Sequence, residues 1–256
     1  MIIHSYENTS RSDACVEYIR SLKNLEKIEQ LFLLPIPSSR DLKTILGTNI
    51  YICDLLELLS GDSLIVGYSM PKGFVEEAKN RGSFVHDISD DEEFLAENAE
   101  LTAEATVGIL LNTVRKSLSD THIGVVGYGR IGKRLTRLLL YLGVSVKVYS
   151  SSDNKRLDLG EWGVATSESA KEADLSGLDV LINTAPALIF NPEDPVFSRG
   201  LRVIDLASGD NFPGLSSVEK YPSVPAKMFP ETAGKAWGRS IERFMNKNVS
   251  SKGNHL

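Results

Sequence analysis

The sequence has few of the residues that build metal sites or disulfide frameworks. Two cysteines, Cys15 and Cys53, and four histidines occur among 256 residues. The cysteines form no short-spaced pair and the histidines are scattered, so neither a disulfide nor a metal site is predicted. We expect both cysteines to serve as buried apolar packing.

Long apolar runs and an excess of basic charge are also missing. No run approaches the roughly 20 apolar residues that cross a bilayer, and the first residues lack the basic segment and apolar core of a secretory signal. The formal net charge of −6 argues against nucleic-acid binding through a basic surface. We therefore expect a cytoplasmic protein that binds neither nucleic acid nor membrane.

The chain does have an ordinary globular composition, with 42% hydrophobic and 24% charged residues. In its N-terminal half, short apolar runs alternate with helical patterns, which favours parallel strands covered on both faces. Strands are predicted at 31–34, 49–53, 63–66 and 83–86, with a helix from Pro71 to Arg81.

A second pattern follows this half. The acidic stretch 87–93 is expected to be a solvated connection. A long helix should then run from about Thr102 to Lys116, because apolar residues recur there at helical spacing. Residues 119–121 break the pattern, so we place a domain boundary after residue 118.

These elements predict an α/β protein with two open parallel-sheet domains separated by a cleft. Residues 1–118 would form a flavodoxin-like N-terminal domain, and residues 119–230 would form a Rossmann domain. A last helix, from Glu231 to about Lys247, would cross back so that segment 231–256 completes the first domain.

The second domain opens with a short strand at 122–126 that runs directly into a glycine-rich turn and an amphipathic helix. The turn is Gly127-Tyr128-Gly129-Arg130-Ile131-Gly132. Gly127 would permit the tight turn, Gly129 would let the backbone approach a pyrophosphate, and Gly132 would let the helix pack closely on the strand. Helix N–H groups and the helix dipole would favour the phosphates. All six residues are predicted to bind a nicotinamide dinucleotide.

Cofactor preference is read at the end of the next strand, 144–149. NAD sites usually carry a carboxylate there, whereas this strand is followed by Ser150, Ser151 and Ser152. These hydroxyls, with Lys155 and Arg156, would hold a 2′-phosphate by charge-assisted hydrogen bonds. The pattern favours NADP over NAD; the alternative is that Lys155 and Arg156 only begin a solvated loop.

Two later strands end in loops of small residues. One loop is Thr184-Ala185-Pro186, and the other contains Ala207 and Ser208. Ligands of open parallel sheets bind at the carboxyl ends of strands. Both loops are therefore predicted to line the path of the nicotinamide; ordinary strand-to-helix turns are the alternative.

Read together, these segments resemble the family of the dipicolinate synthase A subunit. The resemblance rests on five segments in the family's order, which are Asn98–Ala105, Gly127–Gly132, Ile182–Pro186, Asp205–Ser208 and Pro230–Gly234. The chain departs from the family pattern at Leu101 and Ala105, where the family has proline and glycine. A divergent dehydrogenase acting on another small anionic substrate is thus an alternative.

The resemblance implies the last step of dipicolinate synthesis in a spore-forming bacterium. In that step a dihydrodipicolinate-type ring loses two hydrogens to a nicotinamide cofactor, beside a flavoprotein-like B subunit. We also expect a homo-oligomer. A noncatalytic, nucleotide-binding partner subunit is the alternative function.

Catalytic residues are the least defined part of the prediction. Glu104 is the candidate base and Thr102 its neighbour, at the start of the helix that should link the domains; a simple helix cap and acidic first turn are the alternative. Ser69 and Asn98 are candidate substrate contacts. A D-2-hydroxy acid dehydrogenase would need a catalytic histidine, but His255 is the only histidine after Ser208, which argues against that activity.

Overall fold

The computed structural model describes residues 1–22, 27–161, 164–167, 175–186, 197, 200–215 and 217–248. The chain divides into two compact units. Unit 1 comprises Met1–Asn98 and Pro225–Leu256, and unit 2 comprises Ala99–Val224. The prediction divided the chain after residue 118 instead, and the proposed domains and cleft stay predictions.

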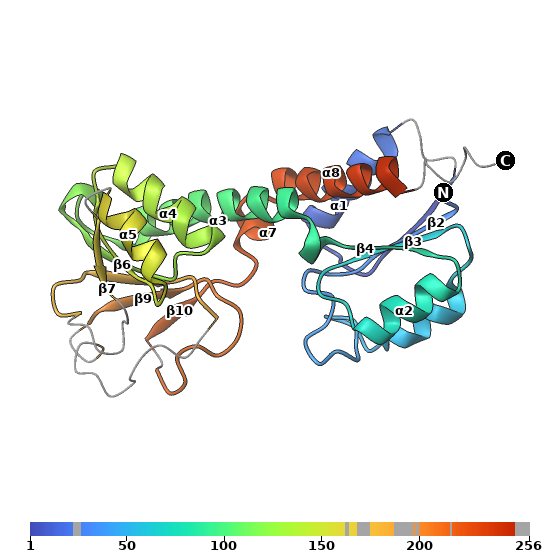
Figure 1. Cartoon of the computed structure of the whole chain (residues 1–256), viewed down its shortest axis with the longest axis horizontal. Coiled ribbons are helices and arrows are strands. Elements are labelled where there is room, and N and C mark those ends of the chain that lie inside the picture. The colour runs from blue at the N-terminus through green and yellow to red at the C-terminus, as the bar shows by residue number, and fades with distance from the viewer. Residues whose placement is uncertain are drawn as a thin grey trace. The chain divides into compact units, whose positions relative to one another are not determined.

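Unit 1 is built on a four-stranded parallel sheet in the order β1-β2-β3-β4 (Figure 1). Its strands are β1 (Ile2–Ser5), β2 (Gln30–Leu33), β3 (Ser63–Gly67) and β4 (Phe84–Asp87). Its helices are α1 (Ser10–Ser21), α2 (Lys72–Asn80), the first part of α3 (Glu92–Thr113) and α8 (Pro230–Asn248).

Alternate side chains of the central strands bury both faces of this sheet. Leu31 and Leu33 of β2 pack with α1 and α8 residues such as Trp237. Phe32, which points to the opposite face, packs with α2 residues such as Phe74. Burial on both faces explains why these strands read as continuous apolar runs rather than as an alternating pattern.

Unit 2 contains a six-stranded parallel sheet in the order β10-β9-β8-β5-β6-β7. The strands are β5 (His122–Val126), β6 (Ser145–Tyr149), β7 (Ala165–Ser167), β8 (Val180–Asn183), β9 (Arg202–Asp205) and β10 (Val218–Lys220). The helices labelled in this part of Figure 1 are α4 (Arg130–Tyr141), α5 (Asp153–Glu161) and α7 (Val224–Met228), which spans the unit boundary. This strand order reverses beside β5, as it does in dinucleotide-binding folds. The predicted class, two parallel-sheet α/β regions of which the C-terminal one is Rossmann-like, is confirmed.

Three predictions in the N-terminal half are wrong. Residues 49–53 do not form a strand of the sheet; Ile52–Leu58 is a 3₁₀ helix whose Ile52 and Leu55 side chains are buried. A short apolar run looks the same whether it fills a strand or one side of a helical turn. The same helix leaves Cys53 exposed, so the prediction that both cysteines are buried fails for this one.

The acidic stretch 87–93 is also not a solvated connection. Asp87 accepts hydrogen bonds from the backbone N–H groups of Ser69 and Met70, at 2.9 and 2.8 Å. Asp91 accepts from the N–H groups of Glu93 and Phe94, at 3.1 and 3.0 Å, and so caps α3. Aspartate is favoured at this position because it satisfies helix N–H groups that have no partner within the helix.

Candidate functional site

The glycine turn joins the carboxyl end of β5 to α4. Gly127 has a φ of +88°, a conformation that glycine adopts without steric cost. Its N–H donates to the carbonyl oxygen of Tyr149 at the end of β6, at 2.9 Å. The turn therefore lies at the junction of two neighbouring strands.

Close packing explains two of the three glycines. A Cβ on Gly132 would lie 2.1 Å from the Gly127 carbonyl oxygen, so α4 can begin there only with glycine. A Cβ on Gly127 would lie 2.8 Å from Thr184 Oγ1. Both glycines are needed by the protein itself, with or without a ligand.

Gly129 is different. No described atom lies within 4 Å of a Cβ built there, and its φ of −81° suits any residue. Gly129 is exposed and is the N-cap residue of α4, without a side-chain cap. The first N–H groups of the helix thus face open space beside a residue with no side chain, an arrangement that suits an anion such as a pyrophosphate.

The other residues of the turn differ in exposure. Tyr128 is buried and Ile131 is half-buried, whereas the Arg130 side chain is exposed. Tyr128 therefore contributes its backbone to the surface of the turn, and Arg130 is the member whose side chain reaches solvent.

The serine loop follows β6 as predicted. Ser150 is buried, Ser152 is half-buried and Ser151 is exposed. The N–H of Ser150 donates to the carbonyl oxygen of Ser167 in β7 at 3.0 Å, which ties the loop to the next strand.

Lys155 and Arg156 lie in α5 rather than in a solvated loop, so that alternative is wrong. Arg156 Nη1 donates to the Ser150 carbonyl oxygen at 2.6 Å, and the same guanidinium pairs with Asp153. Lys155 is exposed, and no described residue pairs with it. Arg156 therefore braces the serine loop, and Lys155 is the cation available beside it.

The loop after β8 is fixed against the glycine turn. The N–H and Oγ1 of Thr184 both donate to the Val126 carbonyl oxygen, at 2.9 and 2.8 Å. Ala185 is half-buried and Pro186 is exposed, while Ala207 and Ser208 in the neighbouring loop are both half-buried. The structure thus brings Thr184 together with the glycine turn.

A buried polar network that the sequence patterns did not predict joins these two loops. Asn183 and Asp205 are 0% and 2% exposed, and Asn183 Nδ2 donates to Asp205 Oδ1 at 2.9 Å. Asn183 Oδ1 accepts from Ala185 N, while Asp205 Oδ1 accepts from Ala207 N, both at 3.2 Å. Asn211 Nδ2 also donates to Asp205 Oδ2, at 3.2 Å. A polar residue in the last position of each apolar strand was the available signal.

The predicted catalytic residues do not begin a helix. Because Asp91 caps α3 ten residues earlier than expected, Thr102 and Glu104 lie in the helix interior, where the N–H groups are already bonded. Thr102 is 4% exposed and Glu104 is exposed. The predictions of a helix-start anion site and of a buried Glu104 are therefore wrong.

The predicted substrate contacts lie in unit 1. Ser69 is exposed in the turn after β3, with a φ of +53°. Asn98 is half-buried within α3. Thr102, Glu104 and the predicted cofactor residues lie in unit 2.

Unit 1 also contains a serine, a histidine and an aspartate in contact. His86 Nε2 lies 2.8 Å from Ser240 Oγ, and that hydroxyl donates to Asp91 Oδ2 at 2.5 Å. Ser240 is 0% exposed and lies between the other two groups, whereas a catalytic triad has the histidine in the middle. Arg243 also binds Asp91, at 2.9 Å. The cluster joins α8 to β4 and the start of α3 and has no accessible nucleophile.

Among the described residues, no helix is long and apolar enough to cross a membrane, and no cluster of histidine, cysteine or carboxylate side chains suits a metal ion.

Comparison with known proteins agrees with this geometry. Residues 98–190 match the family described as D-isomer specific 2-hydroxyacid dehydrogenase, NAD binding domain. The A subunit of dipicolinate synthase from Bacillus subtilis is 25% identical over 167 residues, which are 61% of this chain and 56% of that protein. The matched region thus spans little more than half the length of this curated relative.

Two solved structures share the fold. The dipicolinate synthase A subunit from Bacillus halodurans superimposes with a TM-score of 0.76 at 18% identity, over 95% of this chain and 97% of that one. The NAD complexed form of a D-isomer specific 2-hydroxyacid dehydrogenase from Lactobacillus delbrueckii gives 0.56 at 11% identity, over 100% and 98%.

The fold and the glycine turn therefore define an NAD-binding, dehydrogenase-like protein. More particularly, the chain is related to the A subunit of dipicolinate synthase, which confirms the resemblance seen in its motifs.

The buried His86 makes the stability of unit 1 depend on pH. Burial is the main cause that lowers its pKa, to about 4, against opposing effects of Asp91 and Asp87. Since an unperturbed histidine titrates near 6.5, stability from neutral His86 is complete above about pH 6.5 and is lost as the pH falls towards 4. We expect a loss on the order of 3 kcal/mol in the free energy of unfolding.

Urea unfolding of the parent and of His86→Gln at about pH 7 and about pH 4.5 measures this contribution. Glutamine keeps an N–H donor for Ser240 but does not titrate in this range. The parent should lose more stability than the variant over this interval, and equal losses would show that His86 does not cause the dependence.

Proposed function

We propose that the protein is an NAD(P)-dependent oxidoreductase that oxidises a dihydrodipicolinate-type ring to dipicolinate. The observation that carries the cofactor part is Gly129, the one glycine of the turn for which the described protein has no steric need. A pyrophosphate passing close to this backbone is the reason that dinucleotide folds keep a glycine there. The substrate part rests on the relationship to the dipicolinate synthase A subunit.

In this proposal each segment of the site has a separate task. The turn from Gly127 to Gly132 binds the pyrophosphate, Ser150–Ser152 and Lys155 hold the adenosine ribose, and the loops at 184–186 and 207–208 line the nicotinamide. The Asn183–Asp205 pair keeps the last two loops in register. When bound, the nicotinamide accepts a hydride from a ring carbon. The ring also loses a proton, which a base must accept.

Glu104 remains our proposed base, now as an exposed residue in the middle of α3 rather than at its start. Ser69 and Asn98 remain proposed substrate contacts, and Thr102, being buried, is proposed to position α3. The name of the Bacillus subtilis relative, which makes it one subunit of a synthase, supports a B-subunit partner. Sporulation and homo-oligomer formation are further parts of the proposal.

A noncatalytic nucleotide-binding subunit is the second candidate. It is favoured by one observation: none of the described residues forms a hydrogen bond or ion pair with the Glu104 side chain that would tune it as a base. The two candidates share the cofactor site and differ only in turnover.

The first test is the loss of dinucleotide binding in Gly129→Val. The space around Gly129 admits a side chain, so the fold should survive, whereas the new methyl groups would occupy the path of the pyrophosphate. Calorimetry should show affinity for both NAD and NADP reduced at least about tenfold, a cost of about 1.4 kcal/mol.

Gly177→Val is the matched control, because Gly177 also has open space around it but lies before the amino end of β8. It should bind like the parent. If Gly129→Val also binds both nucleotides as the parent does, the turn is not the cofactor site.

The second test concerns cofactor preference. NADP should bind at least as tightly as NAD, because a charge-assisted bond from the serine loop or Lys155 contributes about 1.5–3 kcal/mol. Ser151→Asp should reverse the preference, since a carboxylate there repels a 2′-phosphate and accepts a hydrogen bond from a ribose hydroxyl. We expect NADP affinity to fall about tenfold or more while NAD affinity is kept. A parent that prefers NAD by that factor contradicts the NADP assignment alone.

The third test addresses turnover. With NADP and a dihydrodipicolinate mixture, Glu104→Gln should lower kcat by about 100-fold or more, the usual contribution of a general base. Glu100→Gln is the control, because Glu100 lies on the same helix in an exposed ion pair with Arg134 that contributes little stability. Undiminished turnover in Glu104→Gln removes Glu104 from catalysis. A parent that binds nucleotide but shows no turnover supports the noncatalytic subunit instead.

A further inference from the structure

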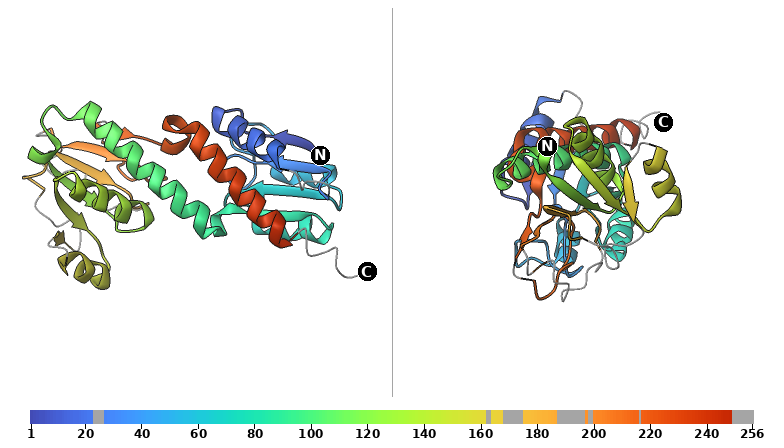
Figure 2. Two further views of the ribbon diagram at one scale, coloured as in Figure 1. Left: turned by 90° about the horizontal axis from the view of Figure 1, so that it is seen from above. Right: turned by 90° about the vertical axis from the view of Figure 1, so that its left-hand side faces the viewer.

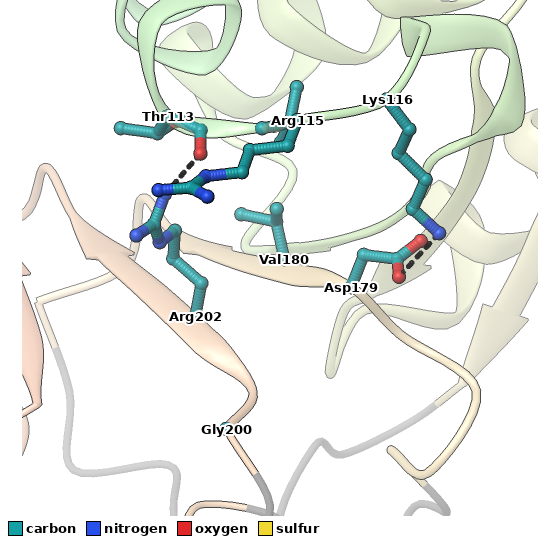
Figure 3. A pocket seen from close by; sticks show the side chains of 8 residues that line it. Thr113, Arg115, Lys116, Asp179, Val180, Gly200 and Arg202 are labelled. Atoms are coloured by element: carbon teal, nitrogen blue, oxygen red, sulfur yellow. Dashed lines mark hydrogen bonds and ion pairs between the residues drawn. The ribbon is translucent and has the colours of Figure 1, made fainter.

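A second concave site lies at the amino edge of the unit 2 sheet, the edge opposite to the glycine turn. It is a pocket of about 290 Å³ where α3 ends and where β8 and β9 begin (Figure 3). The pocket is lined by Thr113, Val114, Arg115, Lys116, Asp179, Val180, Gly200 and Arg202. Its size suits a small molecule rather than a dinucleotide.

The lining contains three cationic side chains and one carboxylate. Lys116 Nζ lies 2.7 Å from Asp179 Oδ1. Arg202 Nε lies 3.1 Å from Glu219 Oε1, and its Nη1 donates to the Thr113 carbonyl oxygen at the end of α3. Two of the three cations therefore already have partners.

Arg115 is the third cation, and no described residue pairs with it. Figure 3 shows its guanidinium reaching towards the same part of the pocket as that of Arg202, while Lys116 and Asp179 lie on the other side. Two guanidinium groups that converge without a shared carboxylate repel each other, and an anion between them would remove that repulsion. Their planar N–H groups match the oxygens of a carboxylate or phosphate.

We propose that this pocket binds a small oxyanion, a phosphate or a carboxylate, held chiefly by Arg115 and Arg202. The site is separate from the proposed cofactor and substrate sites, so the inference does not depend on the proposed oxidoreductase activity. Because Arg202 begins β9 and Thr113 ends α3, the bound anion would also stabilise the junction of these two elements.

Amide NMR spectra of the full chain test the proposal. Inorganic phosphate and succinate are titrated separately at constant ionic strength, with chloride as the balancing anion and NADP present to occupy the glycine turn. We expect saturable shifts of the amide signals of Arg115, Lys116 and Val180. A response to phosphate alone assigns a phosphoryl ligand, and a response to succinate alone assigns a carboxylate.

Arg115→Gln should weaken this binding about tenfold or more, as expected when one charge-assisted contact is lost. Arg20→Gln is the matched control, because Arg20 is exposed in the last turn of α1 in unit 1; it should bind like the parent. The proposal is overturned if neither anion shifts these amides, if shifts occur only at residues 127–132, or if Arg115→Gln binds as the parent does. Loss of NADP binding in Gly129→Val with these shifts intact would confirm that the two sites are independent.

Discussion

The architecture of the candidate cofactor site depends on one backbone contact, the approach of α4 to the Gly127 carbonyl oxygen. Because a Cβ on Gly132 would lie 2.1 Å from that oxygen, the helix can begin directly against the end of β5 only without a side chain. This contact aims the helix N-terminus at the point where the strand order reverses, between β6 and β8. The Asn183–Asp205 network then places two further loops at the same edge.

Unit 1 uses the same physical solution for its C-terminal helix. A Cβ on Gly234 would lie 2.4 Å from the Arg11 carbonyl oxygen, and one on Gly238 would lie 2.4 Å from the Tyr18 ring. Figure 2 shows α8 lying along α1. Between these glycines Trp237 is fully buried, under the guanidinium of Arg11. The glycine of the Pro230–Gly234 segment is thereby explained by helix packing rather than by ligand binding.

The two edges of the unit 2 sheet offer anions different kinds of contact. At the carboxyl edge the donors are backbone N–H groups of a turn and a helix, which carry no net charge and suit a ligand that must also be released. At the amino edge the donors are arginine and lysine side chains, two of which are already partly neutralised by Asp179 and Glu219. The first arrangement is typical of a dinucleotide site, and the second suits a small, compact anion.

Short-range patterns in the sequence determined the parallel α/β class, the position of the glycine turn and the final helix, because strand burial, turn geometry and helix periodicity all act over a few residues. The same patterns misplaced the start of α3, since both Asp91 and Thr102 can cap a helix and only the folded chain shows which one does. They also missed the convergence of Arg115 with Arg202 and the pairing of Asn183 with Asp205. These pairs are joined by strand order and register, which bring distant residues together; local sequence carries no record of that proximity.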